Sequence, residues 1–266
     1  MSRKLKTLAL IALIAAGLAA QETPATGDAP IRAPEAAISP IMQAADSLAS
    51  GGDNLEDLST PVQIALILTV LALAPALLMT VTSFTRIIIV LSFVRRALSV
   101  PELPPNQVLL GLSFFLTLVI MNPVMQAVNE KALQPYLAKE MKLSAAAEIG
   151  GAELGRFLAA QTRDEDLLMM VELTATPAPE SAEDLPLRVL IPAFALSELR
   201  TAFQMGFLVY LPFLIVDLVV ASVLLSMGMF MLPPVIISTP FKILLFVLVD
   251  GWDLVVRSLF TSFQVS

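Results

Sequence analysis

No charged residue interrupts the segment from Leu58 to Thr85, LSTPVQIALILTVLALAPALLMTVTSFT, and this segment decides the fold class. Its opening, Ser59-Thr60-Pro61, is typical of a helix start, because Ser or Thr caps the first turn and Pro suits the first helical position. At about 1.5 Å per residue, roughly 20 apolar residues cross the hydrocarbon core of a bilayer, so the segment is long enough to do so as a helix. Pro75 is expected to kink it.

Similar apolar blocks recur along the chain. A second uncharged run extends from Leu103 to Asn129, and later runs lie on both sides of MGMFMLPP (Met227 to Pro234). The sequence therefore predicts an all-α fold made of two long hydrophobic helical hairpins, residues 59–129 and 189–266, with the Met-rich loop 227–234 in the second.

A polar insert, residues 130–188, separates the two hairpins and is rich in acidic residues. Helical spacing of apolar residues from Ala152 to Val171 predicts a small, mostly helical, water-exposed insert. Arg86, Arg95 and Arg96 favour a cytoplasmic side for the loop within the first hairpin, which leaves the insert on the extracytoplasmic side. Its acids lack the spacing of metal ligands and are expected to form a solvated face.

The N-terminus has the pattern of an export signal over residues 1–19. Arg3, Lys4 and Lys6 precede an apolar run, Leu8 to Leu18, that is too short to span a bilayer and ends in small residues. The alternative is an uncleaved first membrane anchor. Residues 20–58 contain several prolines, many acids and Gly51-Gly52, so we expect a disordered acidic linker without a site.

Composition excludes several classes of function. Hydrophobic residues make up 57% of the chain and charged residues 15%, with 16 Lys and Arg against 23 Asp and Glu, a formal net charge of −7. This balance argues against nucleic-acid binding, which needs clustered basic residues. The chain has no Cys and no His, and no phosphate-binding loop or serine-nucleophile motif occurs in it. We therefore expect no enzyme, no metal and no cofactor.

Four charges lie inside or at the edges of the apolar blocks: Arg86, Asp217, Lys242 and Asp250. A lone charge at the centre of a bilayer costs roughly 2.5–3.5 kcal/mol on insertion scales, so each needs a partner, water or a place outside lipid. Arg86 and Asp250 suit snorkelling at the rim of a helix. If the Met-rich loop is the tip of a hairpin, Asp217 and Lys242 lie at similar depth on its two arms. They then form an ion pair, within one chain or between copies, or they line an aqueous pathway.

The Met-rich loop itself places Met227, Met229, Phe230 and Met231 around Gly228 and before Pro233-Pro234. Met is unbranched and polarizable, so it fills irregular gaps and can re-form contacts after something passes. Ordinary packing explains most methionine clusters. The position of this one at a proline-bounded turn is what makes it a candidate functional site.

Several long segments resemble one known family in the same order. PAFALSELRTAFQMGF (Pro192 to Phe207) and PFKILLFVLVDGW (Pro240 to Trp252) resemble two signature segments of the FliP/SctR family of type III export-gate proteins. Further similar segments are TSFTRIIIVLSFVRRAL (Thr82 to Leu98), PPNQVLLGL (Pro104 to Leu112) and QTRDEDL (Gln161 to Leu167). The whole match covers roughly Leu58 to Phe263.

The resemblance implies a non-enzymatic subunit of the flagellar protein export gate. Such proteins form a ring of five copies, joined by FliR, FliQ and other export-apparatus membrane proteins, through which unfolded flagellar subunits pass. The implied location is the flagellar basal body in the bacterial inner membrane. The helices assemble there into an oligomeric cone, much of it on the periplasmic side. A cleaved signal peptide is also a trait of the family.

The resemblance also assigns residues. Met229, Phe230 and Met231 match the loop that closes the pore as a gasket, although the family usually carries Met at the middle position. Glu198, Asp217 and Lys242 match charged positions of the family core.

Two other classes of function compete with this interpretation. An ion-coupled secondary transporter could use Asp217 and Lys242 as a relay at the bilayer midplane, but such transporters usually have two related halves, and the two hairpins here do not resemble each other. A passive scaffold of the basal body is the third possibility.

Overall fold

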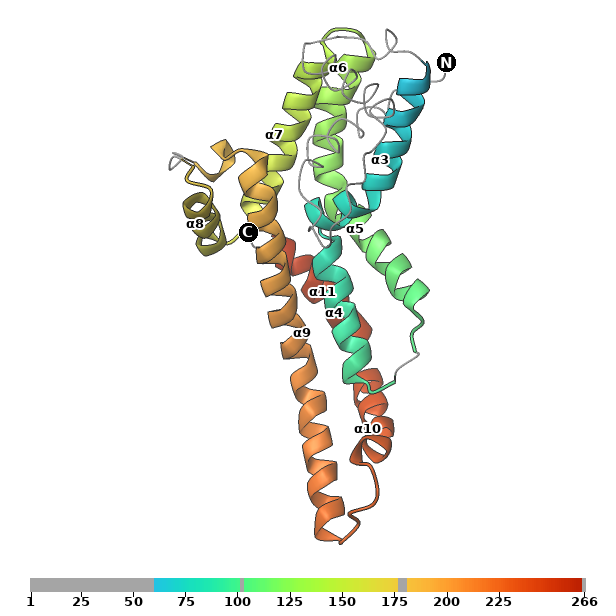
Figure 1. The fold of residues 1–266 in the computed structure, drawn as a ribbon. Helices are drawn as coiled ribbons and strands as arrows, with labels where there is room; N and C mark the ends of the chain where they lie inside the picture. Colours follow the sequence, from blue (N-terminus) through green and yellow to red (C-terminus); the bar gives the residue numbers. More distant parts are fainter. Residues whose placement is uncertain (1–59, 101–102, 177–180, 265–266) are drawn as a thin grey trace, which may run out of the picture. The chain divides into compact units, whose positions relative to one another are not determined.

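The computed structural model describes residues 60–100, 103–176 and 181–264. The predicted signal peptide and acidic linker lie outside these residues. Over the described part of the chain every regular element is helical, which confirms the all-α prediction (Figure 1). The elements are α3 (Thr60–Val81), α4 (Phe84–Ala97), α5 (Asn106–Val128), a π-helical segment (Asn129–Leu133), α6 (Gln134–Leu137), α7 (Leu143–Gln161), α8 (Asp164–Leu173), a short 3-10 turn (Ala182–Asp184), α9 (Leu187–Ser226), α10 (Pro234–Leu248) and α11 (Gly251–Gln264).

Two compact units share these helices. Unit 1 takes its described residues from 60–78, 123–157 and 183–188, and unit 2 from 79–122, 158–182 and 189–264. Unit 1 thus combines parts of the first predicted hairpin with part of the polar insert, and unit 2 combines the rest of both with the second hairpin. A helix pattern in a sequence locates apolar faces but does not say which faces pack together, so the units could not be read from it.

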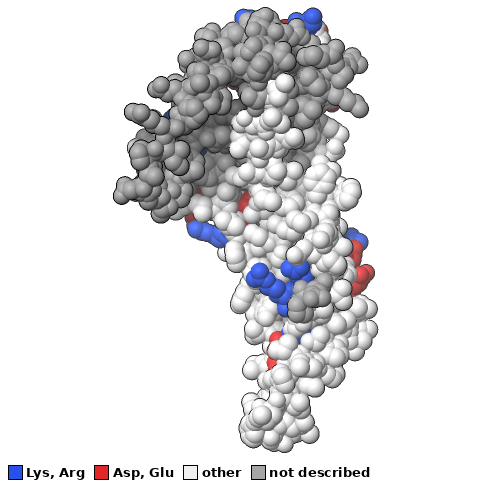
Figure 2. Space-filling model, turned by 45° about the vertical axis from the view of Figure 1, so that its right-hand side comes forward, with Lys and Arg blue, Asp and Glu red and all other residues white. Residues whose placement is uncertain are grey.

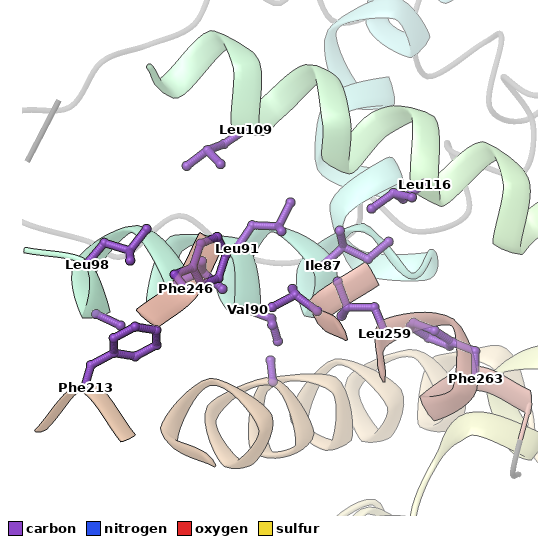
Figure 3. Close-up of a cluster of buried hydrophobic side chains, with 14 residues drawn as sticks. Ile87, Val90, Leu91, Leu98, Leu109, Leu116, Phe213, Phe246, Leu259 and Phe263 are labelled. Carbon is purple, nitrogen blue, oxygen red and sulfur yellow. The ribbon is translucent and has the colours of Figure 1, made fainter. Parts of the chain in front are cut away.

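The core of unit 2 is built around one face of α4. Ile87, Val90, Leu91 and Val94 recur at helical spacing and are at most 1% exposed. Side chains from four other helices close over this face (Figure 3): Leu109 and Leu116 of α5, Phe213 of α9, Phe246 of α10, and Leu259 and Phe263 of α11. Burial of each such side chain contributes roughly 1.5–3 kcal/mol. The core therefore fixes α4, α9, α10 and α11 to one another.

The first apolar segment ends earlier than its sequence suggests. α3 contains Pro75 and ends at Val81, and α4 begins at Phe84. Between them the Thr82 hydroxyl accepts a hydrogen bond from the Phe84 N–H at 3.3 Å. The first N–H of α4, which has no partner inside the helix, is thereby satisfied at the break between the two helices.

The helical middle of the polar insert is likewise divided. α7 ends at Gln161 and α8 begins at Asp164, with Arg163 extended between them (φ −70°, ψ 140°). The Arg163 N–H donates to Ser197 Oγ of α9 at 3.1 Å, a tertiary contact that favours the break. Three acids then fill the first turn of α8, where they complement the helix dipole.

Two helical stretches are long and apolar enough to cross a membrane among the described residues: 106–137 and α9. A third arises if α3 and α4 are counted as one bent span. α9 has 40 residues and contains Pro192 and Pro212. At 1.5 Å per residue it is about 60 Å long, roughly twice the thickness of a hydrocarbon core. A straight helix of this length that crosses a bilayer close to the normal extends beyond the hydrocarbon core.

Candidate functional site

The Met-rich loop connects α9 and α10 as the end of a helical hairpin (Figure 1). Gly228 has φ +77°, in the left-handed region that favours glycine, so it lets the chain turn directly after α9. Beyond it Met229 is 39% exposed, Phe230 76% and Met231 95%. The three predicted gasket residues thus project from the chain without packing inside it.

The arms on both sides of this loop are also apolar and exposed. No charge occurs between Asp217 and Lys242, and the face seen in Figure 2 is white at this end of the molecule. Large exposed side chains lie on both helices: Leu218, Val219, Val223 and Leu225 on α9, and Val235, Ile236, Ile237 and Phe241 on α10. Monomeric soluble proteins rarely expose an apolar surface of this extent. We therefore expect it to contact other apolar groups.

A polar network joins α9 and α10, the two arms of the hairpin, at Asp217 and Lys242, where its uncharged part begins. Lys242 Nζ lies 2.6 Å from Asp217 Oδ2 and 2.7 Å from Ser99 Oγ, and the Ser238 hydroxyl donates to Asp217 Oδ1. The Lys242 side chain has no exposed surface, whereas that of Asp217 is 28% exposed. Asp217 and Lys242 were expected either to form an ion pair or to line an aqueous pathway. In the structure they form an ion pair within one chain.

A second ion pair lies at the other end of the α4 core. Arg86 and Glu198 form a two-pronged contact, Arg86 Nε to Glu198 Oε2 at 3.0 Å and Arg86 Nη2 to Glu198 Oε1. Both side chains are at most 3% exposed. Arg86 was expected to reach water from a helix rim. It does lie in the first turn of α4, but its side chain turns inward because Glu198 offers a buried partner.

Asp250 lies in the turn between α10 and α11 and is exposed. Its φ of +51° is a left-handed conformation that Asp tolerates better than most residues. Its carbonyl accepts the Leu254 N–H at 3.2 Å, so it begins α11 rather than pairing with the buried charges.

A polar cluster between α8 and α9 was missed at the sequence level. Arg200 contacts Glu165 Oε2 at 3.0 Å and Asp166 Oδ1 at 3.1 Å, and Arg163 Nη2 donates to Gln204 Oε1 at 3.1 Å. The acidic partners belong to QTRDEDL in the polar insert, whose acids were expected to form a solvated face, whereas Asp166 is 1% exposed. The density of charge in this segment, beside an apolar run, was the available signal.

The described residues contain no group of three or more Asp or Glu placed to hold a metal ion. Every predicted charged residue of the core is engaged with another protein group, and the exposed end of the hairpin carries no charged side chain. What the arrangement can do is bury apolar surface against neighbours and exclude water.

Comparison with known proteins gives a consistent result. The model of the FliP family matches residues 67–259. The chain is 52% identical over 208 residues to the flagellar biosynthetic protein FliP of Bacillus subtilis (strain 168), which covers 78% of this chain and 94% of that protein. Identity to the protein of the same name from Pectobacterium carotovorum is 52% over 202 residues, 76% of this chain and 78% of that protein. Identity to the flagellar biosynthetic protein FliP of Aquifex aeolicus (strain VF5) is 47% over 216 residues, which covers 80% of this chain and 89% of that protein. These matches confirm the resemblance seen in the sequence: the chain belongs to the FliP family.

Proposed function

We propose that this chain is a core subunit of the flagellar type III protein export gate, where several copies form a pore for unfolded flagellar subunits. The family supports a role in flagellum biosynthesis, since the relatives are named flagellar biosynthetic proteins. The observation that carries the proposal is the α9–α10 hairpin, which ends in the exposed apolar side chains of Met229, Phe230 and Met231.

An apolar tip of this kind suits a seal rather than a binding site. When copies of the chain surround one axis, their tips meet and form a narrow hydrophobic constriction, which excludes water and ions by dewetting. Flexible methionines can part for a polypeptide of any sequence, because apolar contacts are non-directional. The neighbouring copies also cover the exposed arms, whose backbone is already satisfied within each helix.

The implied assembly has five copies of this chain with FliR and FliQ at the bacterial inner membrane. Much of the complex lies on the periplasmic side, and residues 1–19 direct export as a cleaved signal peptide. The length of α9, about twice a hydrocarbon core, supports a location partly outside lipid.

Copy number tests the proposal directly. Native mass spectrometry of the detergent-extracted complex should show five copies together with two other small membrane proteins. Cells that lack the chain should fail to export flagellar subunits and recover export when it is supplied. A monomer or dimer that alone restores export would contradict the gate and favour a transporter.

A further inference from the structure

The C-terminal end of α11 is held by side chains from two other helices. Arg86 Nη1 of α4 donates to the carbonyl oxygen and to the hydroxyl of Ser262, both at 3.0 Å. Gln161 Nε2 of α7 donates to the carbonyl oxygen of Phe263 at 3.1 Å. The last four carbonyl groups of an α-helix have no partner inside the helix, so these contacts satisfy two of them in α11.

Glu198 determines which nitrogen of Arg86 reaches α11. The carboxylate takes up Nε and Nη2, the two donors on one edge of the guanidinium group, and leaves Nη1 free to point at Ser262. The guanidinium carbon also lies 3.8 Å from the centre of the Phe263 ring, a cation–π contact. Lysine has a compact ammonium group without this fork and cannot hold both partners in the same geometry.

α11 in turn forms the base of α10. Leu259 and Phe263 of α11 enter the same core as Phe246 of α10 (Figure 3). The corner between the helices is tight: a Cβ at Gly251 would lie 2.2 Å from the Phe246 ring, and the rings of Phe246 and Trp252 meet edge to face at 5.3 Å. α10 is also the second arm of the hairpin that carries the Met-rich tip.

We infer that the end of α11 is an anchor of unit 2, in which Arg86 and Gln161 are positioning residues and Glu198 orients Arg86. The anchor holds α11 and, through the Phe246 corner, the base of the α10 arm. Its consequence for sealing rests on the proposed function, whereas the anchoring itself does not.

Hydrogen exchange of the purified full complex tests the anchor. Gln161→Leu removes a neutral donor and leaves no buried charge, and Arg86→Lys keeps a cation beside Glu198 but removes the fork. Loss of one hydrogen bond corresponds to about a two- to tenfold change in an opening equilibrium. Gln161→Leu should therefore speed amide exchange in the last turn of α11 by about that factor and leave α4 unchanged. Arg86→Lys loses both bonds to Ser262 and should speed exchange there by at least as much. Glu198→Gln is the milder variant if Arg86→Lys does not assemble.

Thr162→Val is the matched control, because Thr162 is buried directly after Gln161 and its hydroxyl donates to the Leu158 carbonyl of α7 rather than to α11. It should leave exchange in α11 as in the wild type. The anchor would be overturned if Gln161→Leu and Arg86→Lys exchanged the amides of α11 at the wild-type rate. It would also be overturned if the exchange rate rose equally in every helix.

Ion conductance across reconstituted membranes tests the consequence for the seal. Gln161→Leu should leak small ions although its tip is intact. Faster exchange in α11 without a leak would keep the anchor but remove its link to the tip. If truncation of Met229, Phe230 and Met231 to Ala causes no ion leak, the proposed function is contradicted. The exchange result for the anchor would still hold.

Discussion

Lys242 Nζ lies 2.6 Å from Asp217 Oδ2, and the two partners differ in exposure: the lysine side chain is fully buried and that of the aspartate is 28% exposed. The pair joins α9 and α10 at the point where the uncharged part of their hairpin begins. Because a buried charge without a partner is costly, this asymmetry decides which half of the pair can be removed with less damage.

We expect Asp217→Ala to destabilise the protein more than Lys242→Met. The first change strands a fully buried ammonium group, and breaking a buried pair in this way costs about 3–5 kcal/mol. The second keeps most of the side-chain volume and leaves Asp217 with some solvent and the Ser238 hydroxyl. The melting temperature of the purified complex measures both.

Lys131→Ala serves as the control, because Lys131 is 54% exposed in its pair with Glu153 and such pairs contribute about 1 kcal/mol or less. The exchanged pair Asp217→Lys with Lys242→Asp should recover part of the loss. If it recovers nothing, the two charges act separately and the ion pair is not what stabilises the hairpin.

The parts of the structure that local composition decides could be predicted from the sequence. Uncharged runs predicted helices, and a proline-bounded, Met-rich turn predicted the end of a hairpin. Features that depend on partners distant in the sequence could not be predicted from it. Arg86 has the same local sequence whether it reaches water or turns to Glu198, and only the packing of α4 against α9 selects the buried state. The break between α7 and α8 similarly depends on Ser197 of another helix.

Gly206 should tolerate no side chain. A Cβ at this position in α9 would lie 2.5 Å from the Phe93 ring of α4, close to the backbone-proximal atoms of that side chain rather than to a flexible end. Gly206→Ala therefore forces α4 and α9 apart, and overpacking of this kind costs roughly 1–3 kcal/mol. The expected result is a lower melting temperature and less assembled complex.

Gly111→Ala is the matched control in α5, since no heavy atom lies within 4 Å of the added Cβ. Ala is favoured over Gly by about 1 kcal/mol inside a helix, so this variant should be neutral or more stable. Phe93→Ala combined with Gly206→Ala should lose less than the sum of the single changes. If the losses of stability from the two single changes simply add in the double variant, Phe93 and position 206 do not make the steric contact proposed here.

Glu153 predicts a pH dependence for unit 1. The hydrogen bond from Lys131 holds the pKa of the Glu153 carboxyl below its ordinary value of 4.5, with a further contribution from Arg156. A carboxyl whose pKa is lower in the folded state stabilises the fold above pH 4.5 and loses that contribution as the pH falls through the lowered value. Glu153→Gln should therefore lower the melting temperature at neutral pH and approach the wild type in more acidic solution.

The control for Glu153 is Glu148→Gln, an exposed glutamate of the same helix. This variant should melt as the wild type does at neutral pH. A Glu153→Gln variant that differs from the wild type by the same amount at every pH would show that its effect comes from packing and not from ionisation.

The Met-rich tip gives the sharpest test of the proposed gate. Replacement of Met229, Phe230 and Met231 by Ala removes exposed apolar volume without adding charge, and these side chains pack little within their own chain. Subunits should therefore still fold and assemble, while the constriction at the axis widens and small ions leak through it. Phe230→Met keeps an apolar side chain of similar reach and should seal and export normally.

Leu168→Ala with Leu173→Ala is the control for the tip, because these α8 side chains are 68% and 71% exposed but lie outside the hairpin. Conductance is measured across reconstituted membranes, with assembly checked by native mass spectrometry on the same preparation. Only the triple tip variant should leak, because dewetting depends on apolar groups at the narrowest point and not on exposed apolar area elsewhere. If the triple variant assembles and conducts no more than the wild type, the tip is not the seal, and the barrier to ions must be formed by other residues along the pore.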